Sequence, residues 1–256
     1  MKDRRSGIGF GCWLAVVAVV VVVGFLGYKL LTSTGLGLFV AQWASENGHH
    51  DASSLLLRRM ETAHRGEALG WFAHSIESTN LALSARDGSP GCTWDRAREA
   101  AGRHLAAAKA LRNQEQVGRA VYEIALTYHF QKQYDTAAAV VDRELSAFWD
   151  QPWADTYEAW RIMWLTLSGR HEEAIEQFAH YAKRHFVGKQ NERAVGWVWH
   201  AYCQSDRAKE GWSTLSALHA KHPGTPLASA IQDLGGGGKG KPLPTAPPPD
   251  ATPQVP

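Results

Sequence analysis

A repeat of 37 residues constrains the fold of this chain more than any other feature of its sequence. Three similar segments begin at Gln133, Arg170 and Arg207, and each places a small residue four positions further on. A large residue precedes each segment by five positions, and another follows the small residue by four. These positions hold Tyr128, Ala137 and Val141, then Leu165, Ala174 and Phe178, then Tyr202, Gly211 and Leu215. Such a period is typical of repeat proteins, in which stacked two-helix hairpins bury what one hairpin alone leaves exposed.

The whole segment from Phe39 to Leu234 has the composition and periodicity of helices. Ala, Leu, Glu, Gln and Arg dominate it, apolar residues recur at spacings of three and four, and alternating runs are scarce. Turn-forming residues interrupt it at intervals of helical length, for example at Asn47-Gly48, at Ser168-Gly169 and at Pro223. We therefore predict an all-α fold.

Residues 119–223 resemble the tetratricopeptide-repeat (TPR) family. The matching residues are Val121, Ile124, Ala125, Tyr128, Tyr134, Ala137 and Leu145, then Gly169, Ala174, Ile175 and Phe178, then Val195, Val198, Tyr202, Leu218 and Pro223. The 37-residue spacing departs from the usual 34 of the family, and Gly211 replaces the usual alanine.

The resemblance divides the chain into an α-solenoid and its flanking segments. It implies TPR-like helix pairs at 119–152, 156–188 and 193–223, followed by a C-terminal helix up to residue 234. For residues 32–118 we expect a helical region with further, degenerate repeats. Residues 235–256 hold seven of the eleven prolines and five glycines, so we predict a disordered tail there.

The amino-terminal segment predicts a membrane anchor. Ile8 to Tyr28 is a run of 21 residues without a charge, and a helix of that length spans roughly 30 Å, the thickness of the hydrocarbon layer. The alternative is a cleaved signal peptide, whose apolar region is shorter and is followed by small residues. We therefore expect a transmembrane signal-anchor helix over residues 8–31.

The charges around this run predict its orientation. Lys2, Arg4 and Arg5 precede it, whereas Lys29 is the only basic residue from there to Arg58. The positive-inside bias keeps residues 1–7 in the cytoplasm. This predicts a single-pass inner-membrane protein with a periplasmic repeat domain. The opposite orientation would make the repeats a cytosolic docking receptor.

The TPR resemblance also implies a binding groove. In that family the first helices of successive repeats line a concave surface that holds a peptide or a partner helix. The groove positions carried over to this chain are Arg119, Tyr122, Leu126, His129, Met163, Arg193, His200 and Gln204. The Lys and Asn set with which some TPR domains hold a terminal carboxylate is absent, so we expect another mode of protein or peptide recognition.

Tryptophan suggests a second binding surface. Of the eleven tryptophans, Trp160, Trp164, Trp197 and Trp199 are expected to pack between repeats, opposite alanines. Trp149 and Trp153, near a helix end, are the candidates for exposed contact with a partner, because Trp is enriched among binding hot spots.

Catalytic, metal and nucleic-acid sites have little support. His49-His50-Asp51 is compact, but zinc needs four converging ligands and no second cluster accompanies it. There is no Gly-x-Ser-x-Gly elbow and no phosphate-binding glycine loop. Residues 32–234 contain 21 Lys and Arg against 23 Asp and Glu, which offers no basic face for nucleic acid. We expect no enzyme, no cofactor and no metal.

The leading functional hypothesis is a membrane-anchored scaffold or adaptor that binds a protein partner in the bacterial cell envelope, in assembly, secretion or chaperoning. The alternatives are a fixed structural subunit of an envelope complex and, third, an enzyme with an unrecognised site. Self-association is a further option, because Gly7 and Gly11 form a Gly-x-x-x-Gly pair. Cys92 and Cys203 are expected to remain two separate thiols.

Overall fold

The computed structural model describes residues 24, 26, 27, 29 and 35–236. Residues 35–236 form eleven α-helices and two short 3-10 turns, which confirms the all-α prediction for this part of the chain. The chain divides after Gln116 into two compact units.

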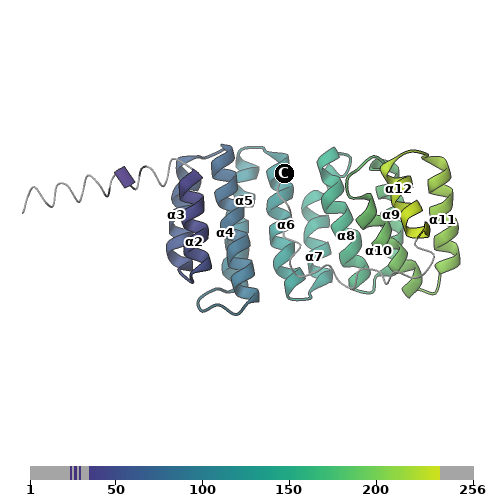
Figure 1. Ribbon diagram of the computed structural model, residues 1–256, viewed down its shortest axis with the longest axis horizontal. Helices are drawn as coiled ribbons and strands as arrows, with labels where there is room; N and C mark the ends of the chain where they lie inside the picture. Colours follow the sequence, from purple (N-terminus) through teal and green to yellow (C-terminus); the bar gives the residue numbers. More distant parts are fainter. Residues whose placement is uncertain (1–23, 25, 28, 30–34, 237–256) are drawn as a thin grey trace, which may run out of the picture. The chain divides into compact units, whose positions relative to one another are not determined.

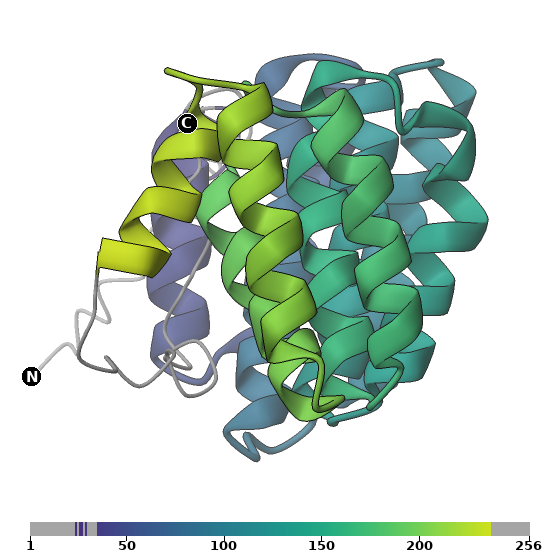
Figure 2. The same ribbon diagram turned by 90° about the vertical axis from the view of Figure 1, so that its right-hand side faces the viewer.

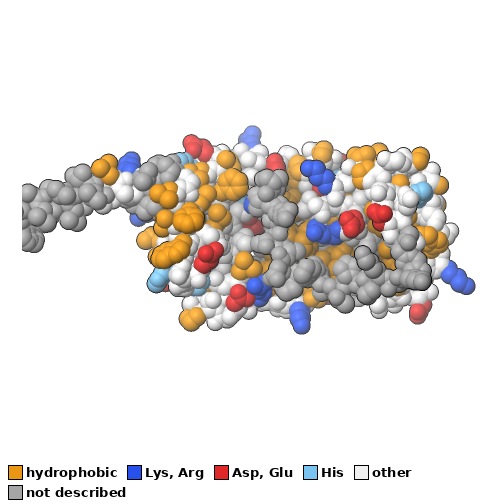
Figure 3. Space-filling model, viewed as in Figure 1, with side chains coloured by type: hydrophobic (Ala, Val, Ile, Leu, Met, Phe, Trp, Pro, Cys, Tyr) orange, Lys and Arg blue, Asp and Glu red, His pale blue; other side chains and the backbone are white. Residues whose placement is uncertain are grey.

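The part of the amino-terminal unit from residue 35 onward contains four helices, in which each helix packs against the next one along the chain (Figure 1). They are α2 (Gly35–Glu46), α3 (His50–Ala63), α4 (Ala68–Arg86) and α5 (Trp94–Ala110). One apolar cluster of Leu57, Met60 and Ala73 joins α3 to α4, and a second cluster joins α4 to α5. Hydrophobic side chains gather on the surface at the end of the unit that α2 and α3 form (Figure 3).

The carboxy-terminal unit contains the repeats. Its helices are α6 (Gln114–Phe130), whose first turn precedes the division, α7 (Tyr134–Leu145), α8 (Asp155–Leu167), α9 (His171–Arg184), α10 (Asn191–Gln204), α11 (Ala208–Lys221) and α12 (Pro226–Gly236). The 3-10 turns Ser146–Phe148 and Pro152–Ala154 connect α7 to α8. Helix α8 packs against α7, α9 and α10, and α12 packs against α10 and α11 (Figure 2).

Three turns of the same geometry lie 37 residues apart in this unit. Lys132, Gly169 and Asp206 have positive φ angles of 59°, 82° and 59°. After each of them, a backbone N–H donates to the carbonyl of the large residue five positions earlier, at 2.9 Å in all three cases. The donor–acceptor pairs are Gln133 to Tyr128, Arg170 to Leu165 and Arg207 to Tyr202. This hydrogen bond around a residue in the left-handed conformation ends the first helix of each hairpin.

The small residues of the repeat are buried where the two helices of a hairpin meet. Ala137 and Ala174 are fully buried, and a Cβ atom on Gly211 would lie 2.5 Å from Cγ of Tyr202. Glycine replaces alanine in the third hairpin because the Tyr202 ring occupies the space of a methyl group. The structure therefore shows an array of helical hairpins, compatible with a helical repeat protein.

The prediction of a transmembrane helix over residues 8–31 is not supported. Most of that segment lies outside the described residues, and no helix in the part that the structure describes is long and apolar enough to span a membrane. The longest one, α4, has 19 residues and carries buried His74 and Glu77. The prediction of a single-pass inner-membrane protein with periplasmic repeats depended on that helix and is withdrawn with it.

The two ends of the chain carry predictions that the structure leaves open. Residues 1–7, expected on the cytoplasmic side, lie outside the described residues. Helix α12 ends at Gly236, so the first two residues of the expected tail are helical. Residues 237–256, the remainder of that tail, also lie outside the described part.

Candidate partner-binding face

The first helices of the three hairpins are joined through Trp160 on α8, which contacts Tyr122 on α6 and Arg193 on α10. We call the surface formed by α6, α8 and α10 around these three residues the first-helix face. Aromatic rings join α6 to α8: the centroid of Tyr122 lies 5.9 Å from that of Tyr157 and 5.2 Å from that of Trp160. Trp160 and Trp164 are buried and form the floor of this face. Rigid aromatic packing fixes the spacing of the helices, and with it the positions of the partly exposed side chains around the floor.

Arg193 connects α10 to this aromatic floor. Its guanidinium carbon lies 4.5 Å from the ring centroid of Trp160, a cation–π geometry. Its NH1 group donates to Oε1 of Gln190 at 2.8 Å. Arg193 is half-buried, and burial lowers the pKa of its guanidinium.

His129 is held on α6 by a tryptophan. Nε1 of Trp164 donates to Nδ1 of His129 at 3.1 Å, so the ring nitrogen that accepts carries no proton. Burial lowers the pKa of His129. Burial and the nearby charge of His171 also lower the pKa of His200 on α10. Both histidines of the face are therefore neutral at pH 7.

The structure places the predicted groove residues at different depths. Tyr122 is 7% exposed and Met163 is fully buried, so neither presents a side chain to a partner. Gln204 is exposed. The half-buried members are Arg119, Leu126, His129, Arg193 and His200. Trp197, which the sequence pattern assigned to packing between repeats, is half-buried on α10, and its ring lies edge-on to that of His200 with 5.9 Å between the centroids.

Trp153 and Trp149 are both half-buried rather than exposed. The ring of Trp153 packs against α6, where a Cβ atom on Gly118 would lie 2.6 Å from Trp153 and 2.6 Å from Tyr157. Trp153 also contacts Phe148, with 5.9 Å between ring centroids. It therefore packs the connection between α7 and α8 against α6.

A buried ionic cluster joins α8 to α9 beside this face. Glu158 is fully buried, and its Oε1 accepts hydrogen bonds from Gln177 and Arg184. Its Oε2 lies 3.0 Å from Nε2 of His185. Asn191 donates to the carbonyls of residues 185, 186 and 188, which fixes the connection to α10. This arrangement gives Oε1 of the buried carboxylate two hydrogen-bond donors and positions the helix that carries Arg193.

The amino-terminal unit has an ionic cluster of its own. Glu77 on α4 is 1% exposed and pairs with Arg58, at 3.0 Å, and with Arg103. Burial raises the pKa of Glu77, and the charge of Glu61 adds to that effect. Burial also pushes the pKa of Glu61 upward, but the hydrogen bond and charge of His74 outweigh burial and leave it below its ordinary value. The cluster ties together α3, α4 and α5.

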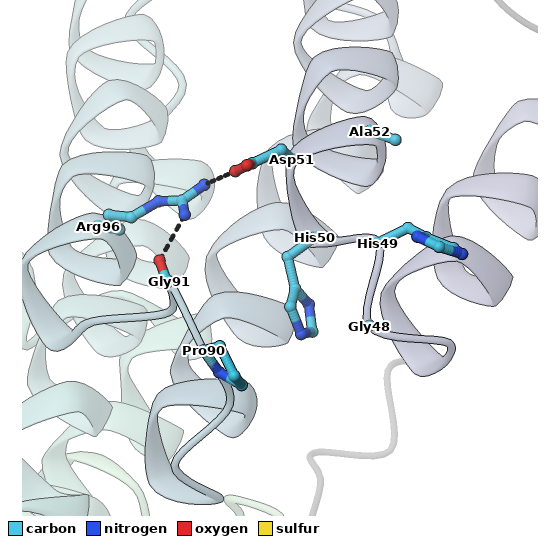
Figure 4. Close-up of a pocket in the computed structure, with 8 residues that line it drawn as sticks. All are labelled: Gly48, His49, His50, Asp51, Ala52, Pro90, Gly91 and Arg96. Carbon is cyan, nitrogen blue, oxygen red and sulfur yellow. Dashed lines mark hydrogen bonds and ion pairs between the residues drawn. The ribbon is translucent and has the colours of Figure 1, made fainter.

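One surface pocket lies between the start of α3 and the start of α5, with a volume of about 350 Å³. It contains the His49-His50-Asp51 motif. Arg96 is held there by Oδ1 of Asp51, at 2.7 Å, and by the carbonyl of Gly91 (Figure 4). The ring of His49 points away from Arg96. The charges of this pocket are thus already paired, and within residues 35–236 no group of three or more His, Cys, Asp or Glu is arranged to hold a metal ion.

Both cysteines of the described part are free thiols. Cys92 is buried in the amino-terminal unit, and Cys203 is half-buried on α10. Burial raises the pKa of each thiol. Neither has the lowered pKa of a nucleophilic cysteine.

The fold and this face define an all-α protein built from helical hairpins. The chain matches no protein family model, no curated protein and no solved structure.

Proposed function

We propose that the chain is a helical-repeat adaptor that binds a protein or peptide partner on its first-helix face. In this proposal the three hairpins of the carboxy-terminal unit are divergent TPR-like repeats, and the protein acts by binding rather than by catalysis. The observation that carries the proposal is the alignment of α6, α8 and α10 around one aromatic floor, with half-buried side chains at its rim.

The composition of the face supports this role. Trp, Tyr and Arg are the residues that most often dominate binding energy, because Trp and Tyr offer a large, rigid contact area and Arg offers a planar set of hydrogen-bond donors. Trp197 and Arg193 combine this chemistry with partial exposure. The floor beneath them is rigid, so a partner would not have to order it on binding.

Photo-crosslinking in cells tests the proposal. A photoreactive residue is placed at Trp197 on the first-helix face or at Glu176, an exposed position on α9, in the full chain. We expect a discrete adduct with one partner from Trp197 and none from Glu176. Equal adducts from both positions, or adducts from Glu176 alone, would show that the binding surface lies elsewhere, as in a fixed subunit that uses the second helices.

A further inference from the structure

Arg193 differs from the other half-buried arginines of residues 35–236 in its lack of an ion pair. Within residues 35–236 every other half-buried arginine makes an ion pair with a carboxylate. The arginines without an ion pair, Arg59, Arg65 and Arg112, are exposed. Arg193 is thus the one partly buried arginine in the described part that makes no ion pair with a carboxylate; the exposed Glu192 beside it acts on it only through its charge.

This absence is energetically costly. A cation that loses part of its hydration needs a compensating anion or a full set of hydrogen bonds. Arg193 has one hydrogen bond, to Gln190, and one ring contact, to Trp160. Arg161 on the neighbouring helix α8, in contrast, has a counter-ion within the chain, because its NH2 group lies 3.3 Å from Oδ1 of Asp142.

We infer that Arg193 recognises the side-chain carboxylate of an aspartate or glutamate in the partner. This inference rests on the proposed function, since it assigns the chemistry of a ligand bound on the first-helix face. The planar guanidinium has two nitrogens free to donate, which matches the two oxygens of a carboxylate. Trp160 below the guanidinium holds its plane in place.

A singly charged carboxylate suits this site better than a phosphate. The other arginine of the face, Arg119, is already paired, with 3.7 Å to Glu123. His129 and His200 are neutral because burial lowers the pKa of each ring. The face therefore offers one available positive charge. Trp197 lies on the same helix, one turn away, so an apolar residue beside the acidic one completes the recognised segment.

The test is a selection of displayed random peptides of 12 residues on the full chain, followed by binding measurements. Selected peptides are synthesised with both ends blocked, so that only side chains carry charge. Each acidic residue is replaced in turn by its amide, and affinities are measured by fluorescence anisotropy. The protein variants are Arg193→Gln, Arg193→Lys, Trp197→Ala and, as a matched control for the arginine variants, Arg59→Gln, at an exposed arginine that makes no ion pair.

We expect selected peptides to share an acidic position whose conversion to the amide weakens binding about tenfold to a hundredfold, as for a charge-assisted hydrogen-bonded pair. The Arg193→Gln variant should bind the acidic peptide more weakly than the parent by the same factor. Its affinity should not change further when the acidic residue of the peptide is replaced by the amide. Arg193→Lys should fall between, because it keeps the charge but loses the planar fork. Arg59→Gln should bind as the parent does. Thermal melts establish that each variant is folded.

Three results would overturn the inference. Peptides that lose affinity in Trp197→Ala but ignore both Arg193→Gln and the amide change would show a partner on this face without acidic recognition, which leaves the proposed function standing. A selection that enriches no acidic position would contradict the inference directly. Asp250 is the only acidic residue of 237–256, so an Asp250→Asn chain that binds the acidic peptide more tightly than the parent would instead identify Asp250 of this chain as the competing occupant of Arg193.

Discussion

Replacing Gly211 with alanine tests the helix crossing on which the repeat depends. The new Cβ atom would lie 2.5, 2.7 and 2.8 Å from three carbons of Tyr202. Carbon atoms pack best at about 3.5–4.0 Å, so the ring would have to move by roughly 1 Å. Such overpacking costs about 1–3 kcal/mol. Alanine in a helix interior regains about 1 kcal/mol over glycine, so Gly211→Ala should lower the free energy of unfolding by up to about 2 kcal/mol.

Gly196 on α10 provides the matched control. No atom lies within 4 Å of a Cβ built there, so Gly196→Ala should raise the free energy of unfolding by about 1 kcal/mol. Urea denaturation followed by circular dichroism measures both changes. The double variant Gly211→Ala with Tyr202→Leu copies the Ala174–Leu165 pair of the preceding hairpin and should recover stability relative to additive behaviour. A Gly211→Ala variant as stable as Gly196→Ala would refute the close contact between Gly211 and the Tyr202 ring at the helix crossing.

The other predictions concern buried charge. Glu158→Ala should lower the free energy of unfolding by about 3–5 kcal/mol, because it leaves Arg184 and His185 without their partner, and Glu158→Gln should cost less; chemical denaturation compares the two. Burial lowers the pKa of His129, so its contribution to stability is complete above pH 6.5 and is lost as the pH falls toward the folded-state pKa. His129→Gln keeps an acceptor for Trp164 and should reduce the loss in urea midpoint between pH 7.5 and pH 5.5; an unchanged pH dependence would contradict this. Glu77→Ala should destabilise the amino-terminal unit, seen as earlier hydrogen exchange in α4, because Arg58 and Arg103 lose their shared carboxylate.

The repeat could be read from the sequence because it depends on local chemistry. A left-handed turn residue, a small residue at the crossing and a large one opposite it are each visible as residue types at fixed spacing. The turns at Lys132, Gly169 and Asp206 lie where that spacing predicts the end of a first helix.

The extent to which each side chain is buried could not be predicted in the same way. Helix α8 packs against helices on three sides, so its apolar residues have no single buried stripe. Met163 and Trp164 are both fully buried although they are adjacent in the chain. A groove position carried over from a repeat pattern therefore becomes a core position wherever a neighbouring helix covers it.

The sequence also could not predict that Arg193 makes no ion pair with a carboxylate. Glu192 precedes it and Gln190 lies one turn back, and either could serve as a partner by spacing alone. Only the tertiary arrangement shows that Gln190 is bound, that Trp160 lies beneath the guanidinium, and that no carboxylate pairs with it.

The most direct test of the first-helix face is the affinity of the crosslinked partner for two double variants. One removes Trp197 and His200 from the face, and the other removes Glu176 and His180 from the exposed side of α9, all by substitution with alanine. Loss of a tryptophan hot spot costs about 2 kcal/mol or more, or roughly thirtyfold in affinity. We predict a loss of that size or greater for the first variant and less than about twofold for the second. Equal affinities for the two variants, or a larger loss from α9, would contradict binding at the first-helix face.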